Sequence, residues 1–279
     1  MSELDPLAVN QAHWEDRTAV HLSSHHYDVE GWLRDRPGPR TREHLPLGEV
    51  AGRDLVHLQC HFGLDTLTFA TAGAQVTGVD FSPAAIAAAR DIAKRAGLVG
   101  SATFVCASVD DAPVALGHAT FDIVYVSLGS LCWLPDVTRW AATVAALLVP
   151  GGRLYLHDVH PLAWSLDDEV FTVAYSYFEE SEPLALDEPF SYTDQEKPLA
   201  HPRSYSWNHS IGEVVNALIA QGLRITALVE HDWTVRQAWP WLVRVPPDPG
   251  DTAREPHWAN PPDMPRIPLT FTLLAERPL

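Results

Sequence analysis

A short stretch in the first half of the chain combines residue types that could bind a nucleotide. Residues 54–80 read DLVHLQCHFGLDTLTFATAGAQVTGVD, which is an apolar run, a tight loop, a helix-like segment and a second apolar run. Gly63 in the loop would let a ligand come close to the backbone. Asp80, at the end of the second run, could accept hydrogen bonds from both hydroxyls of a ribose. This layout predicts a nucleotide-binding βαβ unit.

The same loop is a poor cradle for a pyrophosphate. Dinucleotide sites use GxGxxG spacing, which leaves bare backbone amides at the start of the helix. Here the loop holds one glycine, Gly63, and two bulky polar residues, Gln59 and His61. A nicotinamide-dependent oxidoreductase is therefore an alternative that this loop disfavours, and measurable hydride transfer would revive it.

Strands and helices alternate around this stretch. We expect strands at residues 55–58, 75–79, 102–106, 121–126 and 153–158, helices at residues 64–72, 83–96 and 136–148, and a turn at residues 150–152. Ser82 at a capping position, Pro83 in the first turn and Gly97 at the end delimit the second helix. Alternation at this spacing implies a parallel sheet covered on both faces. Such a sheet binds ligands at the carboxyl ends of its strands.

The two flanking regions are less regular. Before the sheet we expect helices at residues 9–22 and 41–47, separated by a Pro-Gly-Pro break. After it we expect a helix at residues 210–222 and strands at residues 223–233 and 268–275. Residues 179–201 and 236–266 form long proline-containing stretches, and loops of this length tend to be lids or binding loops. Six tryptophans of this last region could be ordinary core or could wall an apolar substrate pocket: Trp164, Trp207, Trp233, Trp239, Trp241 and Trp258.

Composition limits the classes of protein to consider. The chain has 279 residues, 46% of them hydrophobic, which is enough to bury a substantial core. Its formal net charge of −17 repels phosphate backbones, so a nucleic-acid substrate is not expected. We find no apolar run of the ~20 residues that span a membrane, and no secretion signal. Cys60, Cys106 and Cys132 lack CxxC spacing and suggest reduced, buried thiols in a cytoplasmic protein.

Three later segments narrow the interpretation. FDIVYVS at residues 121–127, WLPD at residues 133–136 and LVPGGRL at residues 148–154 resemble the succession FDxV, LPD and LKPGG of class I S-adenosylmethionine-dependent methyltransferases. The beginning of residues 54–80 is similar to that family's VLDLGCGTG, and VDFS at residues 79–82 to its GxDxS. The resemblance covers about residues 50–160. The run HLQCHFGLDTL, HHYDVE at residues 25–30 and His160-Pro161 further resemble a bacterial subgroup of small-molecule-type methyltransferases.

The resemblance implies an α/β fold. It would be a Rossmann-like, seven-stranded, mostly parallel sheet with helices on both faces. Residues 1–53 would form an N-terminal helical cap and residues 54–160 the S-adenosylmethionine-binding core. Residues 161–279 would complete the same domain with irregular insertions that act as a substrate lid.

The implied cofactor is S-adenosyl-L-methionine, and the implied reaction moves its methyl group to O or N of a small organic molecule. An alternative is a protein of this fold that binds the cofactor without methyl transfer, as a cyclase-like enzyme or a regulatory binding module. Neither a metal nor a membrane partner is expected. The oligomeric state stays open, a homodimer included.

Residues that match the family motifs are the candidate cofactor ligands: Leu58, Gln59, Cys60, His61, Gly63, Asp80, Phe81, Ser108, Val109, Asp110 and Ser127. The sequence departs from the family, which usually has an acidic residue at His57 and glycines at Gln59 and His61. The side chain of Gln59 could donate to the carboxylate of the methionine tail, as could His61. The family's common acidic residue at Ser108 could be replaced by Asp110.

Methyl transfer from a sulfonium can require a base that deprotonates the acceptor, most often histidine. The candidate catalytic residues are His25, His26, Tyr27 and His160. The histidines also have a structural interpretation, as a solvated pair for His25 and His26 and as a turn for His160-Pro161. The candidate substrate-binding residues are Trp133, His157 and Trp164, although His157 alternates with Tyr155 and is better interpreted as facing a covering helix.

Overall fold

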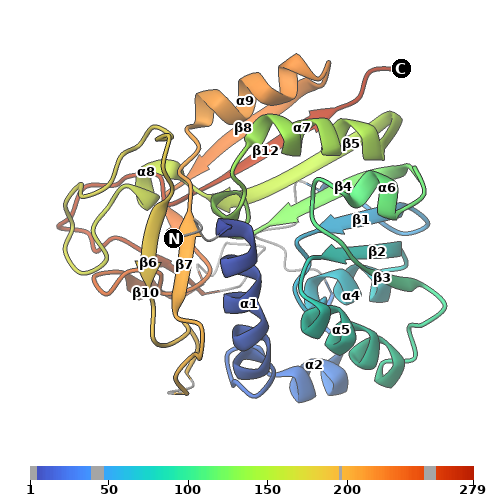
Figure 1. Cartoon of the computed structure of the whole chain (residues 1–279), viewed down its shortest axis with the longest axis horizontal. Coiled ribbons are helices and arrows are strands. Elements are labelled where there is room, and N and C mark those ends of the chain that lie inside the picture. The colour runs from blue at the N-terminus through green and yellow to red at the C-terminus, as the bar shows by residue number, and fades with distance from the viewer. Residues whose placement is uncertain (1–4, 39–46, 195–196, 248–255) are drawn as a thin grey trace.

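The computed structural model describes residues 5–38, 47–194, 197–247 and 256–279 (Figure 1). Its main sheet has seven strands in the order β3-β2-β1-β4-β5-β12-β8. The strands are β1 (Asp54–Leu58), β2 (Gln75–Asp80), β3 (Ala102–Cys106), β4 (Phe121–Ser127), β5 (Leu148–Val159), β8 (Arg224–His231) and β12 (Thr270–Glu276). Strands β1 to β5 pair in parallel, whereas β12 runs antiparallel to both of its neighbours. The seven-stranded, mostly parallel sheet is confirmed.

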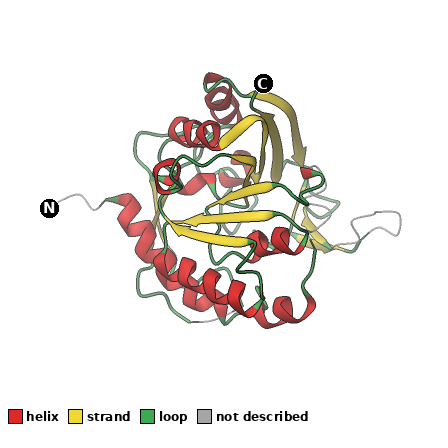
Figure 2. Cartoon of the chain, turned by 90° about the vertical axis from the view of Figure 1, so that its right-hand side faces the viewer, coloured by secondary structure: helices red, strands yellow, loops and turns green. Residues whose placement is uncertain are grey.

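Helices cover both faces of this sheet (Figure 2). They are α1 (Pro6–Leu22), α2 (Val29–Asp35), α4 (Leu64–Thr71), α5 (Pro83–Arg95), α6 (Ala112–Ala115), α7 (Val137–Leu147), α8 (Pro161–Trp164) and α9 (Ile211–Ala220), with a 3-10 turn η2 (Leu131–Trp133). Buried residues of α6, α7 and α9 pack against one face. Those of α4 and α5 pack against the other, with α2 beside them.

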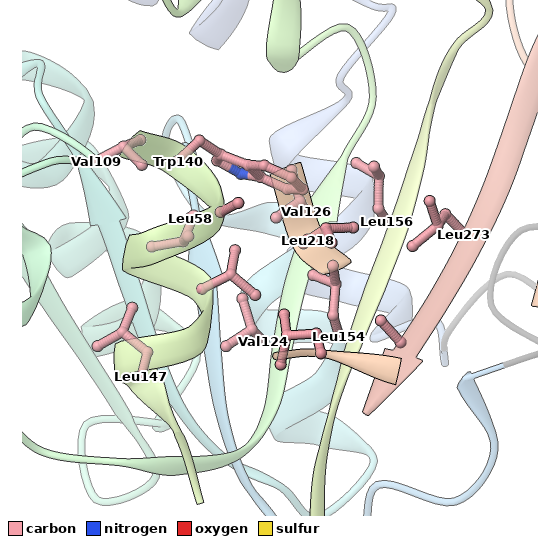
Figure 3. Packing of buried hydrophobic residues seen from close by; sticks show 14 of the residues in the cluster. Leu58, Val109, Val124, Val126, Trp140, Leu147, Leu154, Leu156, Leu218 and Leu273 are labelled. Carbon is pink, nitrogen blue, oxygen red and sulfur yellow. The ribbon is translucent and has the colours of Figure 1, made fainter. Parts of the chain in front are cut away.

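Alternating apolar side chains build the core beneath α7 and α9 (Figure 3). Val124 and Val126 of β4 point to this face together with Leu154 and Leu156 of β5, and Trp140 of α7 lies fully buried over them. Complete burial of such a side chain contributes roughly 1.5–3 kcal/mol. Because a one-residue slip would expose this whole set, the pattern fixes the strand register. It thereby brings the carboxyl ends of β1 to β4 to one edge.

The predicted element boundaries agree with the structure at the caps and differ at two points. Ser82 Oγ accepts a hydrogen bond from Ala85 N at 3.0 Å and starts α5 as expected. Helix α1 starts earlier than predicted, at Pro6, because Asp5 caps it and proline suits the first turn. The expected turn at residues 150–152 is instead part of β5, whose first residue, Leu148, pairs with Phe121 before the register shifts. The helix expected at residues 41–47 lies almost entirely outside the described residues.

The long stretches after the core contain small sheets that the sequence pattern did not indicate. β6 (Leu184–Asp187) pairs with β7 (Arg203–Ser206). β9 (Trp233–Thr234), β11 (His257–Ala259) and β10 (Val243–Val245) form a second small sheet. In Figure 1, β6 and β7 stand on the side of α1 opposite to α4 and α5.

Helix α1 holds β7 by polar contacts. The side-chain amide of Asn10 donates to Tyr205 O and accepts from Tyr205 N, both at 2.8 Å. Arg17 pairs with Glu188 at 2.7 Å, just past β6. We call α1, β6, β7 and residues 188–194 the cover, because they close the carboxyl edge of the main sheet.

The structure tests two expectations from composition, that the thiols are reduced and buried and that no segment spans a membrane. All three cysteines are free, with Cys60 and Cys132 buried as expected, but Cys106 exposed at the end of β3. Cys106 is exposed because β3 is the edge strand of the sheet. None of the helices in the described ranges is long and apolar enough to cross a membrane.

Candidate active site

A cavity of about 370 Å³ lies at the carboxyl edge of the main sheet. The strand order reverses between β1 and β4, and ligands of open α/β sheets bind beside such a switch. Loops that follow β1, β2, β3 and β4 line one side of the cavity. The cover and the loop after β9 line the other side.

Ten of the eleven predicted cofactor ligands line this cavity: Gln59, Cys60, His61, Gly63, Asp80, Phe81, Ser108, Val109, Asp110 and Ser127. The remaining one, Leu58, is fully buried in the core beneath α7 and does not face the cavity. Its side chain points away because successive residues of a strand face opposite sides. The roles of the ten as ligands stay predictions.

The loop after β1 has left-handed backbone at three positions. The φ angles are +57° at Gln59, +51° at His61 and +76° at Gly63. The first two are costly, because left-handed backbone disfavours residues with a Cβ by roughly 1–2 kcal/mol each. Gly63 is required sterically as well, since a Cβ there would lie 2.5 Å from the ring of Phe104. The chain thus keeps a glycine-like loop path while carrying two large polar side chains on it.

Gln59 connects the loops after β1 and β4. Its Nε2 donates to Ser130 O at 2.9 Å. Its Oε1 is buried and has no hydrogen-bond partner within the described part of the chain. The side chain therefore offers an acceptor, which differs from the donor role expected for it from the sequence. An ammonium group is the ligand chemistry that this oxygen suits.

Asp80 ends β2 and is the buried carboxylate of the cavity. Its two oxygens accept from His61 N at 2.8 Å and from Ser82 N at 2.9 Å. Burial raises the pKa of this carboxyl to about 6, although the two amides act in the opposite direction. Each oxygen keeps a further lone pair, and hydroxyl donors would favour the charged form.

The loops after β2 and β3 form the side of the cavity suited to a flat ring. Phe81 and Val109 supply apolar surface there. Ser108 Oγ donates to Asp111 at 2.7 Å, and Asp110 pairs with Arg139 at 2.9 Å. Asp110 thus lines the cavity with its charge already partnered, and partial burial raises its pKa.

Asp158, at the end of β5, fixes the loop after β4. Its buried carboxylate accepts hydrogen bonds from the backbone amides of Gly129, Ser130 and Leu131. Those residues carry the carbonyl that holds Gln59. Asp158 itself does not line the cavity. It is a positioning residue for the cavity wall.

Four aromatic side chains line one part of the cavity, and we define them as the aromatic wall: Trp14, Tyr27, Trp133 and Tyr192. The rings of Trp14 and Trp133 meet edge to face with centroids 5.3 Å apart. The hydroxyls of Tyr27 and Tyr192 are 2.6 Å apart. Burial and the neighbouring Tyr192 raise the pKa of Tyr27, so its phenol stays protonated.

His61 connects the loop after β1 to the cover. Its Nε2 is 2.9 Å from His21 Nδ1, and His21 Nε2 is 2.6 Å from Ser191 Oγ. Burial lowers the pKa of His61 to about 3 and that of His21 to about 2. Both imidazoles are therefore neutral at physiological pH, and His61 lines the cavity as a neutral group.

The candidate catalytic residues separate into two groups. His26 and Tyr27 line the cavity. His160 does not, because its Nδ1 caps α8 by accepting from Leu162 N and its Nε2 meets Glu230 at 2.9 Å. His25 is also outside, with a side chain that is 94% exposed and an ion pair to Asp194 at 2.7 Å.

The candidate substrate residues separate in the same way. Trp133 lines the cavity, whereas His157 and Trp164 do not. His157 lies 2.9 Å from Thr272 Oγ1 and stacks on Trp233. Trp164 meets Trp239 edge to face in a separate apolar cluster.

Sequence reasoning missed several residues that line the cavity: Leu7, Trp14, Asp65, Tyr192, Val235 and Arg236. Trp14 lies within the helix predicted at residues 9–22, which by itself did not point to the cavity. Tyr192 and Arg236 stand in the irregular stretches and carried no signal.

The cavity fits the cofactor that the sequence motifs imply. S-adenosylmethionine has an ammonium group, two ribose hydroxyls, a flat adenine and a sulfonium. The unpartnered Gln59 Oε1 suits the ammonium and Asp80 the hydroxyls. Phe81 and Val109 suit the adenine, and aromatic faces such as those of the wall attract cations.

Comparison with known proteins agrees with this geometry. Residues 56–152 match the family model described as methyltransferase domain. A ubiquinone biosynthesis O-methyltransferase of Methylocella silvestris is 32% identical over 134 residues, which are 48% of this chain and 47% of that protein. An uncharacterized methyltransferase of Synechocystis is 33% identical over 46% of this chain and 59% of its own length. The chain spans about half the length of the first curated relatives that it matches.

Solved structures show the same fold. An S-adenosylmethionine-dependent methyltransferase from Mesorhizobium loti superposes with a TM-score of 0.57 at 24% identity, over 85% of this chain and 96% of that one. One from Listeria monocytogenes gives a TM-score of 0.57 at 16% identity, over 86% and 98% of the two chains. Residues 56–152 are therefore similar to a methyltransferase domain, and the chain has the fold of S-adenosylmethionine-dependent methyltransferases.

Proposed function

We propose that the chain is a methyltransferase that moves a methyl group from S-adenosylmethionine to O or N of a small organic molecule. One observation carries the proposal: a single cavity joins a polar edge that fits the cofactor to an aromatic wall that fits an organic acceptor. The relatives named ubiquinone biosynthesis O-methyltransferase favour oxygen as the acceptor atom. The narrower likeness to the bacterial subgroup with the HLQCHFG loop belongs to the same proposal.

The bound cofactor would supply an activated methyl group on a positive sulfur. For an in-line displacement, the protein must hold the acceptor atom opposite that methyl group at roughly 3–3.5 Å and exclude water. Asp80 and Gln59 would fix the ribose and the amino-acid tail. Trp14 of the cover and Trp133 of the loop after β4 would exclude water and hold the acceptor molecule, since their rings meet edge to face in the lining of the cavity.

A hydroxyl acceptor also has to lose a proton. Tyr27 stays protonated and would donate a hydrogen bond to the acceptor molecule rather than take its proton. Besides His57, whose Nδ1 lies 2.8 Å from Thr66 Oγ1, the imidazoles that line the cavity within the described residues are His26 and His61. We propose that one of them accepts the hydrogen bond of the acceptor group, while His25 and His160 take no part in the reaction.

The protein would work in the cytoplasm on a freely diffusing substrate. Three free thiols support a reducing compartment. The division into a cap, a cofactor core and a lid-bearing C-terminal half is part of the same proposal, and α1 lies where a cap would close the site.

Two measurements test the proposed function. Calorimetry should show binding of S-adenosylmethionine and S-adenosylhomocysteine, and a methyl-transfer assay over phenols, alcohols and amines should find an acceptor. The variant His61→Asn should lower turnover with little change in S-adenosylhomocysteine affinity if His61 serves the acceptor. His160→Ala is the control and should keep full turnover. Binding of both ligands with no transfer to any acceptor would favour a cofactor-binding protein without methyl transfer.

A further inference from the structure

The lining of the cavity contains one cationic side chain among its described residues, Arg236. It follows β9 in the loop that closes the cavity on the side of the cover. Its guanidinium carbon lies 4.7 Å from the ring centroid of Tyr192, and the residue is half-buried. The ring therefore holds the guanidinium at the cavity by a cation–π contact.

Arg236 has no hydrogen bond or ion pair with any of the residues that the structure describes. Nearby Arg17 shows the usual arrangement, because its guanidinium pairs with Glu188 at 2.7 Å while lying over the ring of Trp14. The chain has 36 acidic and 19 basic residues, so carboxylate partners are abundant. A partly buried guanidinium without one has donors left for a ligand.

The charges of the cavity are divided between its two sides. Asp65, Asp80 and Asp110 line the loops that fit the cofactor. Two tyrosine rings separate Arg236 from those loops. Tyr27 contacts His61 of the loop after β1, and its hydroxyl meets that of Tyr192. The ring of Tyr192 in turn contacts Arg236. The cation thus stands at the aromatic wall, where the acceptor molecule would lie.

We propose that Arg236 binds a carboxylate of the acceptor molecule, and that the substrate is therefore an aromatic acid whose ring packs against Trp14 and Trp133. This rests on the proposed function for the identity of the site as a methyl-acceptor site. A guanidinium matches one carboxylate with two parallel hydrogen bonds. A phosphate carries nearly two charges, and no second cation among the described lining residues would balance it.

Calorimetry in the presence of saturating S-adenosylhomocysteine tests the proposal. The probes are benzoate, 4-hydroxybenzoate, 4-hydroxyphenylacetate and 4-hydroxycinnamate, each beside its neutral amide. At least one acid should bind the native protein more tightly than its amide by about tenfold to a hundredfold, the usual effect of a charge-assisted hydrogen bond. Arg236→Gln should remove this preference without changing S-adenosylhomocysteine affinity.

Two further variants control for charge and folding. Arg236→Lys should keep part of the preference for the acid, because lysine keeps the positive charge but cannot make the two parallel hydrogen bonds of a guanidinium. Arg244→Gln makes the same charge change in β10, at an exposed residue outside the cavity, and should behave as the native protein. All three variants should have the same melting temperature as the native protein, since none loses an ion pair that the structure describes.

Other results would overturn the proposal. No preference for any acid over its amide would do so. An unchanged preference in Arg236→Gln would do so as well, and weaker S-adenosylhomocysteine binding in that variant would assign Arg236 to the cofactor. These measurements involve no methyl transfer. A protein that binds the acids through Arg236 but methylates nothing would therefore keep the carboxylate site and lose the proposed function.

Discussion

The sheet core and the cover are held together in different ways. In the core, apolar side chains such as Val126 and Trp140 interlock over short, regular connections. In the cover, polar pairs join distant parts of the chain. Asn10 bonds Tyr205 across 195 residues, and Arg17 bonds Glu188 across 171.

This difference separates the two halves of the function. The core presents the loops that fit a cofactor common to the whole class. The cover supplies Trp14 and Tyr192 to the lining of the cavity, where the proposed acceptor molecule would lie. Under the proposed function, cofactor binding would depend on the core, and substrate choice on a part of the chain that a few polar contacts assemble.

The largest expected effect is the loss of stability on removing Asp158, a polar group on which the core itself depends. Asp158→Ala removes the acceptor of three backbone amides in the loop after β4, of which those of Ser130 and Leu131 are buried. Buried donors left unsatisfied cost about 1–3 kcal/mol each, so we expect the free energy of unfolding to fall by about 3 kcal/mol. Urea denaturation measures it, with exposed Asp91→Ala as the control. A loss no greater than that of the control would contradict this account of the loop.

A substitution in the cover should loosen the cover and leave the core of the sheet intact. Asn10→Ala deletes both bonds to the backbone of Tyr205 from a residue that is 1% exposed, which should cost about 2 kcal/mol locally. Hydrogen exchange should quicken in α1 and β7 and stay slow in β1 and β4. Exposed Ala19→Gln on α1 is the control. Equal quickening throughout the sheet would show that the two regions unfold as one unit.

Cofactor binding should depend on the core carboxylate. Asp80→Ala should weaken S-adenosylhomocysteine binding by about 1–3 kcal/mol, the usual effect of losing charge-assisted hydrogen bonds. Calorimetry measures the affinity, and Asp91→Ala again serves as the control. Unchanged affinity would show that the ribose does not lie at Asp80.

The same carboxylate should make cofactor binding depend on pH. Ribose donors favour the charged form of Asp80, whose pKa is about 6 in the free protein. Affinity should therefore be full above that pKa and fall below it, by at most about tenfold per pH unit. His61 and His21 have pKa values of about 3 and 2 and stay neutral over this range. Calorimetry from about pH 5 to about pH 8 should show the decrease, and Asp80→Asn should abolish it.

The smallest effect concerns the left-handed backbone at Gln59 in the loop after β1, with His118, which lies after α6, as the reference position. His118 is exposed and has a φ of +59°, so His118→Gly should raise the free energy of unfolding by about 0.5 kcal/mol. Gln59→Gly relieves similar strain but loses the bond to Ser130, so we expect no gain. Urea denaturation of both variants checks this. A gain for Gln59→Gly as large as that for His118→Gly would mean that the Gln59 bond contributes nothing.

Much of the core could be predicted from the sequence because its signals are local. Ser82 and Pro83 mark the start of α5, and the continuous apolar run at residues 123–126 marks a buried strand. The loop that ends at Gly63 and the carboxylate at Asp80 located ten residues that line the cavity. The small sheets of the cover were missed because β6 and β7 are four residues each, too short for a periodic pattern.

The sequence by itself determined the parallel sheet and the loops that line the cavity, because apolar periodicity and capping act between residues a few positions apart. Its motifs carried the resemblance to class I methyltransferases. It could not determine which histidines and aromatic residues meet. His25 and His26 are neighbours, yet only His26 lines the cavity, and Tyr27 meets Tyr192 across 165 residues. Tertiary structure decided these contacts, because they depend on how α1 and the later loops dock over the sheet. No pattern within either segment records that docking.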